Sequence, residues 1–469
     1  MTTTTRFNSY LMGNFAPVSE EITADNLEIK GELPRDLSGM YVRNGPNPQF
    51  TPLGKYDWMD GDGMLHGVRI SGGKAEYKNR YVRTGGFEVE RDFGYAVWSG
   101  RLEPPQVCNP YGPYKNVSNS SVSYHNGKLL TFWEAGLPYA VEVPSLETIG
   151  PYLCDGYLDS TFTSHPKVDP MTGELIFFGY ALDAPPYLKY GVISSNGELL
   201  QIVPINIPVA SGPHDFAITK NYTILIDLPL RFRPERVEQG LPGWIFEKGV
   251  PSRFGILPRY GNNEDIQWFE AHPCYINHIL NAYEDGDEVI LYACRMSSTH
   301  SYASSFRDRD PDENIPRMYG WAFNLKTGAV REGMLDKRPS EFPSINHRFV
   351  GREMRYGYTS RMASLQPLFD GIIKYDFYTG RSITHDFQEQ RYGGAVTFAP
   401  RIGAIDEDDG WLLTFVYDEK DKCSELLVID AQNMREDPVA RVILPQRVPY
   451  GFHGTWISEM QLINNSSRI

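Results

Sequence analysis

The sequence has 469 residues, and its 45 Lys and Arg against 59 Asp and Glu leave a formal net charge of −14. This charge argues against a nucleic-acid partner, because phosphate binding needs a positive surface. No apolar run reaches the roughly 18 residues of a membrane-spanning helix. The N-terminal stretch lacks a signal-peptide pattern, and the five Cys form no CxxC pair. We therefore expect reduced thiols and a cytoplasmic protein.

Seven polar turns, each between two short apolar strands, recur along the chain. They start at Val68, Val141, Val192, Ile256, Ala322, Ile373 and Val428. Their mean spacing of about 60 residues is somewhat more than one four-stranded propeller blade, which leaves room for loops. Each turn is typical of the outer hairpin of a blade. The pattern predicts an all-β, seven-bladed β-propeller as a single domain over residues 1–469, with a generic all-β protein rich in hairpins as the alternative.

Three loop-rich stretches, residues 100–125, 230–255 and 298–318, do not follow this rhythm. Long loops in a compact domain are uncommon without a function. We expect them to build a dome of loops and helices over the propeller axis.

Four histidines share one local setting, at the edge of an apolar run and flanked by Pro, Gly or Asn. They are His165, His214, His278 and His453. Their separations correspond to about one, one and three blade intervals, so each is expected on a different blade. Inner strands meet at the axis, where four imidazoles could bind Fe, Zn, Cu or Ni. No HxH or HExxH motif is present, and on spacing alone hydrogen-bonded core histidines remain the alternative.

Several long segments occur in an order that identifies a family. They include GELPRDLSGMYVRNGPNPQF, YDWMDGDGMLHGVRI, FTSHPKVDPMTGEL, PHDFAIT, EFPSINHRFVG and RVPYGFHGTW. Over nearly its whole length the chain resembles the carotenoid cleavage oxygenase family. The resemblance implies a seven-bladed propeller with a loop-and-helix dome and one Fe2+ per chain. It also implies a non-haem dioxygenase that uses O2 to split a conjugated double bond of a carotenoid or apocarotenoid into two carbonyl products.

The resemblance also assigns the site. The iron ligands of the family match His165, His214, His278 and His453, and it implies no catalytic residue beyond the metal centre. Glu134 and Glu341 match carboxylates that orient ligand imidazoles. A third family Glu falls on Ala395, in RYGGAVTFAPR. One imidazole is therefore expected to lack its acceptor, in a natural or an engineered variant, with weaker metal binding or lower activity.

The substrate can be narrowed by the same resemblance. The segments GFHGTWISEMQL and DWMDGDGMLHGVRI look most like plant-type enzymes that cut the 9,10 and 9′,10′ bonds. Stilbene-cleaving members carry Lys before the first Glu, where this chain has Trp133. A stilbene-cleaving oxygenase and a catalytically impaired binding propeller are the alternatives. An apolar substrate suggests peripheral membrane contact, for which Asp227–Phe232 and Gly240–Gly249 are candidates.

Overall fold

The computed structural model describes residues 8–156, 158, 161–299, 314–363 and 367–466. The chain divides into two compact units. Unit 1 is Met1–Tyr152, Phe415–Leu427 and Val439–Ile469, and unit 2 is Leu153–Thr414 and Val428–Pro438.

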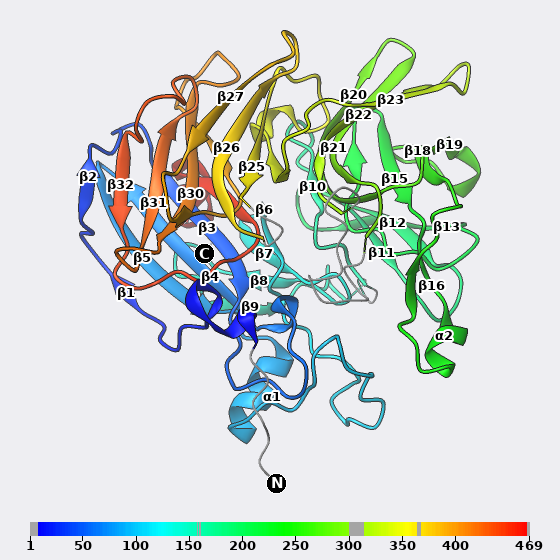
Figure 1. The fold of residues 1–469 in the computed structure, drawn as a ribbon, viewed down its shortest axis with the longest axis horizontal. Helices are drawn as coiled ribbons and strands as arrows, with labels where there is room; N and C mark the ends of the chain where they lie inside the picture. The colour runs from blue at the N-terminus through cyan, green and yellow to red at the C-terminus, as the bar shows by residue number, and fades with distance from the viewer. Residues whose placement is uncertain (1–7, 157, 159–160, 300–313, 364–366, 467–469) are drawn as a thin grey trace. The chain divides into compact units, whose positions relative to one another are not determined.

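Unit 1 joins the two ends of the chain through strand pairing. One sheet has the order β1 (Thr23–Ala24), β5 (Lys74–Tyr81), β4 (Gly63–Ser71), β3 (Gly39–Pro46) and β33 (Gly454–Ser458). The next along the chain has the order β6 (Ser121–His125), β7 (Lys128–Phe132), β8 (Tyr139–Val141) and β9 (Thr148–Pro151). The C-terminal β33 is antiparallel to β3, so N-terminal and C-terminal strands lie in one sheet (Figure 1).

A further sheet also pairs strands from both ends of the sequence. Its order is β2 (Ile29–Gly31), β32 (Ala440–Ile443), β31 (Cys423–Asp430), β30 (Gly410–Asp418) and β28 (Arg391–Tyr392), with β29 (Thr397–Pro400) paired to β30. Every residue of β30 is buried. A continuous apolar run such as GWLLTFVYD is typical of a strand that is covered on both faces.

Unit 2 contains four antiparallel meanders in chain order. The first is β10 (Lys167–Val168), β11 (Leu175–Tyr180), β12 (Leu188–Ile193) and β13 (Leu199–Ile205). The second is β14 (Ala217–Ile218), β15 (Tyr222–Asp227), β18 (Ser252–Pro258) and β19 (Gln267–Ala271). The third is β20 (Tyr275–Asp285), β21 (Glu288–Met296), β22 (Arg317–Asn324) and β23 (Val330–Met334). The fourth is β24 (Ser340–Ser344), β25 (Tyr356–Met362), β26 (Phe369–Asp376) and β27 (Arg381–Asp386).

Sheets that follow one another in unit 2 share their apolar cores. Ile226 and Phe254 of the second meander pack in one buried cluster with Leu291 and Trp321 of the third. Burial of such side chains contributes about 1.5–3 kcal/mol each. Face-to-face packing of sheets follows from strands that are apolar on both sides.

The hairpin prediction is confirmed at all seven places. The predicted turns connect β4–β5, β8–β9, β12–β13, β18–β19, β22–β23, β26–β27 and β31–β32. Within the described residues, seven sheets of four or more strands carry one such hairpin each. The fold is the predicted all-β, seven-bladed β-propeller.

Helices are short and lie in the connections. They are α1 (Gly85–Phe93), α2 (Pro234–Glu238) and α3 (Glu459–Ser466), with 3-10 turns η1 (Ser9–Leu11), η2 (Gly13–Phe15), η3 (Trp58–Asp60), η4 (Asn263–Asp265) and η6 (His347–Phe349). Among the described residues, none of these helices has the length and apolar character that crossing a bilayer requires.

Two of the three predicted loop regions can be compared with the structure. Residues 100–120 of the first stretch hold no strand, as expected, but residues 121–125 form β6. The second stretch, 230–255, instead contains β16 (Leu230–Phe232), α2, β17 (Trp244–Phe246) and the start of β18, because β16 and β17 pair in a small separate hairpin. Of the third region, residues 300–313 lie outside the described part of the chain.

Candidate metal centre

Three of the four predicted histidines converge in unit 2. His165 and His214 lie two and three positions before the short first strands β10 and β14, and His278 lies in the first strand β20. The ring centroids are 4.7 Å apart for His165 and His214, 4.9 Å for His165 and His278, and 5.2 Å for His214 and His278. Interplanar angles of 62°, 77° and 73° show that the rings approach one another from three directions.

The nitrogen atoms of this cluster are spaced as metal ligands would be. Nε2 of His165 and Nε2 of His214 are 3.1 Å apart. Two imidazole nitrogens at ~2.1 Å from one ion, at an angle near 90°, would lie about 3 Å apart. The three-histidine cluster could therefore bind a metal ion, and neutral imidazoles suit a transition metal.

Glu341 contacts the third imidazole. Its Oε2 atom lies 2.5 Å from Nδ1 of His278. With the proton on Nδ1, His278 donates to this carboxylate and leaves Nε2 as the lone-pair nitrogen for a metal. The predicted role of Glu341 fits this contact, although Glu341 and His278 are 63 positions apart in the sequence.

Without a bound cation, burial favours the neutral forms of both His278 and Glu341. Burial lowers the pKa of His278 well below its ordinary value, and the nearby His214 adds to this effect. Burial raises the pKa of Glu341 to about 8, against the hydrogen bond from Phe342 N–H. A neutral imidazole is the form that a metal needs, because an imidazolium has no lone pair to offer.

The backbone around these side chains departs from regular strand geometry. Strand β20 is irregular between Ile276 and Ile279, and β24 between Glu341 and Ser344. Phe342 has a φ of 53°, which is rare for a bulky residue. This conformation lets Phe342 N–H donate to Glu341 Oε2 at 2.5 Å, while the Phe342 ring lies 5.4 Å from that of His278. Bulges and strained residues of this kind are frequent at functional sites.

Two further site residues escaped the sequence analysis. Asp215 follows His214 and is 2% exposed, and its Oδ1 lies 2.6 Å from Lys167 Nζ. Both are charged residues that interrupt apolar segments directly beside a histidine, in PHDFAI and SHPKV. A charge in such a position needs a partner when buried, which is the signal that could have identified them.

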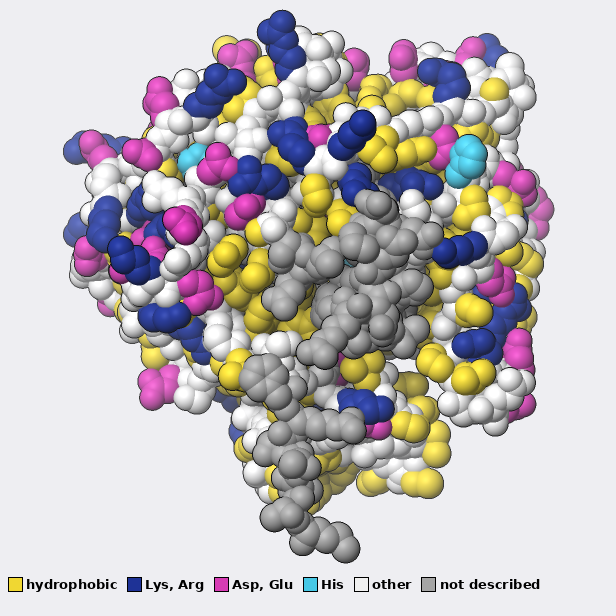
Figure 2. Space-filling model, in the orientation of Figure 1, with side chains coloured by type: hydrophobic (Ala, Val, Ile, Leu, Met, Phe, Trp, Pro, Cys, Tyr) yellow, Lys and Arg dark blue, Asp and Glu magenta, His cyan; other side chains and the backbone are white. Residues whose placement is uncertain are grey.

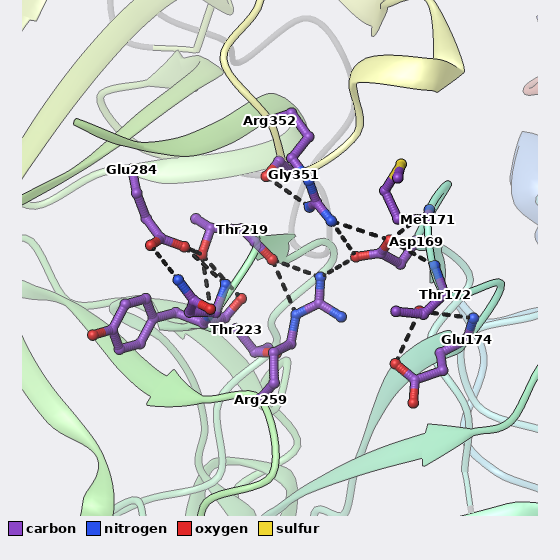
Figure 3. Close-up of polar contacts among 12 residues, drawn as sticks. Asp169, Met171, Thr172, Glu174, Thr219, Thr223, Arg259, Glu284, Gly351 and Arg352 are labelled. Carbon is purple, nitrogen blue, oxygen red and sulfur yellow. Dashed lines mark hydrogen bonds and ion pairs between the residues drawn. The ribbon is translucent and has the colours of Figure 1, made fainter. Parts of the chain in front are cut away.

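The other ends of the same first strands are tied together by polar contacts (Figure 3). Asp169, directly after β10, accepts from Arg259 Nη2 at 2.6 Å and from Arg352 Nη2 at 3.2 Å. Arg259 also donates to the carbonyl of Thr219, directly after β14, and Glu284 near the end of β20 accepts from the Thr219 hydroxyl. The strands that carry His165, His214 and His278 are thus fixed at the end away from the imidazoles.

The fourth predicted ligand, His453, lies in unit 1 directly before β33. Its carbonyl accepts from Asn44 N–H at 3.0 Å, and Phe452 N–H donates to the Asn44 carbonyl at 3.0 Å. Gly451 permits this close packing, since a Cβ atom there would lie 2.9 Å from Arg43 Nε. Each of the four predicted ligands therefore lies in, or at most three positions before, the first or last strand of its own sheet.

The other two predicted residues also have defined places. Glu134 of unit 1 is half-buried in the turn after β7. Ala395 of unit 2 is 4% exposed and lies between β28 and β29. The neighbouring Gly394 carbonyl accepts from Ser360 Oγ at 2.7 Å, so the backbone beside Ala395 is anchored to β25.

Comparisons with known proteins agree with the fold. The family described as retinal pigment epithelial membrane protein matches residues 15–458. A carotenoid 9,10(9′,10′)-cleavage dioxygenase 1 from Arabidopsis thaliana is 41% identical over 97% of this chain and 90% of its own length.

Solved structures extend this likeness to three dimensions. The lignostilbene dioxygenase of Pseudomonas brassicacearum has a TM-score of 0.89 and 28% identity, covering 96% of this chain and 98% of its own. The cobalt-substituted apocarotenoid oxygenase of Synechocystis has a TM-score of 0.83 and 26% identity, covering 94% and 97%. The match to the family over nearly the whole chain shows that this protein belongs to the carotenoid cleavage oxygenase family.

Proposed function

We propose that the protein is a non-haem Fe2+ dioxygenase that cleaves one conjugated double bond of a carotenoid or apocarotenoid, at the 9,10 (9′,10′) position, into two carbonyl products. The observation that carries this proposal is the convergence of three imidazoles, one of them in contact with Glu341. The 41% identity to a plant 9,10(9′,10′)-cleavage dioxygenase supports the bond that is attacked. O2 is the second substrate.

We further propose that His453 is the fourth ligand and that Glu134 orients one of the imidazoles. The support is the shared sequence setting and the shared position of the four histidines in, or just before, a first or last strand. Ala395 stands where a third carboxylate would accept an imidazole proton, so this chain would hold its metal with two orienting carboxylates.

Iron in this site would supply the activation of O2. Burial lowers the pKa of His278 and favours its neutral imidazole, and Glu341 accepts a hydrogen bond from Nδ1–H of His278 so that Nε2 keeps its lone pair. The buried ring of Phe342 packs against His278 and restricts water beside it. No general acid or base is required, because the reaction joins oxygen to carbon without an obligatory proton transfer from the protein. The remaining task of the chain is to place one double bond of a long polyene.

A stilbene substrate is the second candidate, because the lignostilbene dioxygenase is a close structural neighbour, with a TM-score of 0.89. Trp133 disfavours it, since a neutral indole offers no positive charge to a phenolate oxygen, unlike the Lys of stilbene-cleaving relatives. The third candidate is a propeller of the same fold that binds its ligand without converting it.

One experiment separates the three candidates. Protein purified without chelator is analysed for metal, loaded with Fe2+ under a reductant, and mixed in air with β-carotene, several apocarotenals and a hydroxystilbene. About one iron per chain and aldehyde or ketone products of 9,10 cleavage are expected. Products from the stilbene alone would favour the second candidate. Iron binding with no product would favour the third, and absence of iron would overturn the proposed metal centre.

Peripheral membrane contact is proposed for the α2 hairpin. Val237 and Leu241 are 49% and 46% exposed, and hydrophobic side chains are visible on the surface around α2 in Figure 2. Leu228 and Leu230 of the first predicted segment are buried in the core, so the contact would depend on the second segment and α2. A Val237→Ser/Leu241→Ser variant should bind liposomes less than wild type, whereas Met334→Ser, at an equally exposed position on β23, should not. A cytoplasmic location remains a prediction.

A further inference from the structure

Asp215 connects three different sheets of unit 2 through one buried carboxylate. Its Oδ1 accepts from its own neighbour Phe216 N–H at 2.7 Å and from Lys167 Nζ at 2.6 Å, and its Oδ2 accepts from Ile279 N–H at 2.8 Å. Lys167 belongs to the sheet of β10, Phe216 precedes β14, and Ile279 belongs to β20. Strand pairing within a sheet does not provide links of this kind.

Each contact of this carboxylate lies within two residues of a candidate ligand. Asp215 directly follows His214, Ile279 directly follows His278, and Lys167 is two positions after His165. Consecutive Cα atoms are ~3.8 Å apart. A shift of Asp215, Ile279 or Lys167 is therefore expected to move the neighbouring imidazole by a similar distance.

The surroundings explain why the carboxylate is fixed. Asp215 is 2% exposed, and a buried charge is retained only when it is paired and hydrogen-bonded. Strand β20 pairs irregularly between Ile276 and Ile279. In this stretch the Ile279 N–H donates to Asp215 and not to a neighbouring strand. Lys167 Nζ also lies 5.7 Å from the centre of the fully buried Phe216 ring, which limits where the ammonium can move.

We propose that Asp215, with Lys167, is a positioning residue that fixes the mutual geometry of His165, His214 and His278 and thereby sets metal affinity. This inference rests on the proposed metal centre. It assigns to Asp215 a role that differs from that of a carboxylate in contact with a ligand imidazole. Glu341 sets the rotation of one ring, whereas Asp215 sets the separation of three backbone segments.

The test compares this ion pair with a matched one in the same unit. Lys374 Nζ and Asp408 Oδ2 are 2.5 Å apart, and both side chains are largely buried, with no histidine among their contacts in the structure. The variants are Asp215→Asn, Lys167→Met and Lys167→Arg, with Asp408→Asn and Lys374→Met as controls. Affinity for Co2+ is measured by titration, the ligand-field absorption of the Co2+ form reports ligand geometry, and thermal unfolding of the metal-free protein reports stability.

Asp215→Asn and Lys167→Met should weaken Co2+ binding about 10–100-fold, the range found when orienting partners of metal ligands are lost. Their Co2+ absorption bands should also shift. Lys167→Arg should restore most of the affinity, because it keeps a cation at the same place. Asp408→Asn and Lys374→Met should lower the unfolding temperature without changing either Co2+ readout. The double variant Lys167→Met/Asp215→Asn should be little worse than Asp215→Asn, since both changes remove one interaction.

Unchanged Co2+ affinity and absorption in Lys167→Met would overturn the inference. That variant is the safer one to produce, because the Lys167 side chain is 21% exposed, whereas Asp215 is buried. Equal losses of affinity in the Lys374 and Asp408 controls would also overturn it, since the effect would then follow stability alone. Failure of the wild-type protein to bind any metal would instead refute the proposed metal centre.

Discussion

Glu341 and His278 form the best-defined contact of the candidate centre, at 2.5 Å. In Glu341→Gln the side-chain volume is kept, but the acceptor is no longer charged, and the His278 imidazole becomes a weaker donor to a metal. Metal affinity should fall about 10–100-fold. Titration with Co2+ or Fe2+ under anaerobic conditions measures it.

Glu284→Gln provides the control for this change. Like Glu341, Glu284 accepts hydrogen bonds from a distant part of the sequence, here from Thr219 and Asn221. These contacts lie at the end of β20 that is away from His278. Its substitution should leave metal affinity within twofold of wild type. An equal loss in both variants would mean that Glu341 has no special relation to the metal.

A substitution at Ala395 tests the addition of an orienting carboxylate, whereas Glu341→Gln tests the loss of one. Ala395→Glu should raise metal affinity and initial rate, because a carboxylate there could accept a hydrogen bond from an imidazole and make that ring a stronger donor to the metal. Iron content and rate are measured for both forms prepared in parallel, with Ala395→Gln as the uncharged variant of equal size. Ala395 is only 4% exposed, so lower stability with unchanged iron content would show that the added side chain clashes and supports no ligand.

At the scale of elements, the far ends of β10, β14 and β20 depend on Asp169 (Figure 3). Burial alone would raise the pKa of Asp169, but hydrogen bonds from Met171 N–H and Arg259 outweigh it and lower the pKa below its ordinary value. Because the folded pKa is depressed, the carboxylate stabilises the fold above about pH 4, and this contribution is lost as the pH falls through the folded pKa.

Asp169→Asn should therefore lower the free energy of unfolding at pH 7 by about 3–5 kcal/mol, since two arginines lose their buried partner. The difference from wild type should shrink as the pH falls from about 5 through the folded pKa. Thermal unfolding across that range measures it. Asp376→Asn, which breaks a partly exposed pair with Arg355, should cost no more than about 1 kcal/mol at pH 7. A difference for Asp169→Asn that stays constant with pH would contradict the titration of this carboxylate.

At the scale of the molecule, metal binding and stability are linked. A ligand that binds only the folded state stabilises it by about 2.7 kcal/mol at a free concentration one hundred times its dissociation constant. Removal of metal with a chelator should therefore lower the unfolding temperature, and Fe2+ or Co2+ should restore it. In His214→Ala the same additions should have a much smaller effect. An unfolding temperature insensitive to metal in the wild-type protein would contradict the proposed centre.

The whole reaction should proceed without an organic cosubstrate. The sequence has no G-x-G-x-x-G turn opening a helix and no Lys-containing phosphate loop. Product formation should be unaffected by added nicotinamide, flavin or a 2-oxo acid, and a reductant such as ascorbate should help only by keeping iron reduced. Turnover that strictly requires one of these cosubstrates would refute the proposed reaction.

The sequence by itself determined the fold class and the candidate ligands. Polar turns such as the one between Val68 and Tyr77 mark hairpins because turn chemistry is local, and all seven predicted turns connect the expected strands. His165, His214 and His278 could be selected because each interrupts an apolar segment beside Pro, Gly or Asn. Glu341 could be assigned only through its resemblance to a family motif.

Only the tertiary structure decided which side chains act together. The contact of Glu341 with His278 and the three contacts of Asp215 join segments far apart in sequence, and no local periodicity encodes them. Neither the positive φ of Phe342 nor the irregular pairing of β20 could be predicted from the sequence. A short apolar segment predicts a regular strand whether or not that strand bulges. A hairpin is specified by its own few residues, whereas a metal-binding geometry is specified by how separate sheets are fixed to one another.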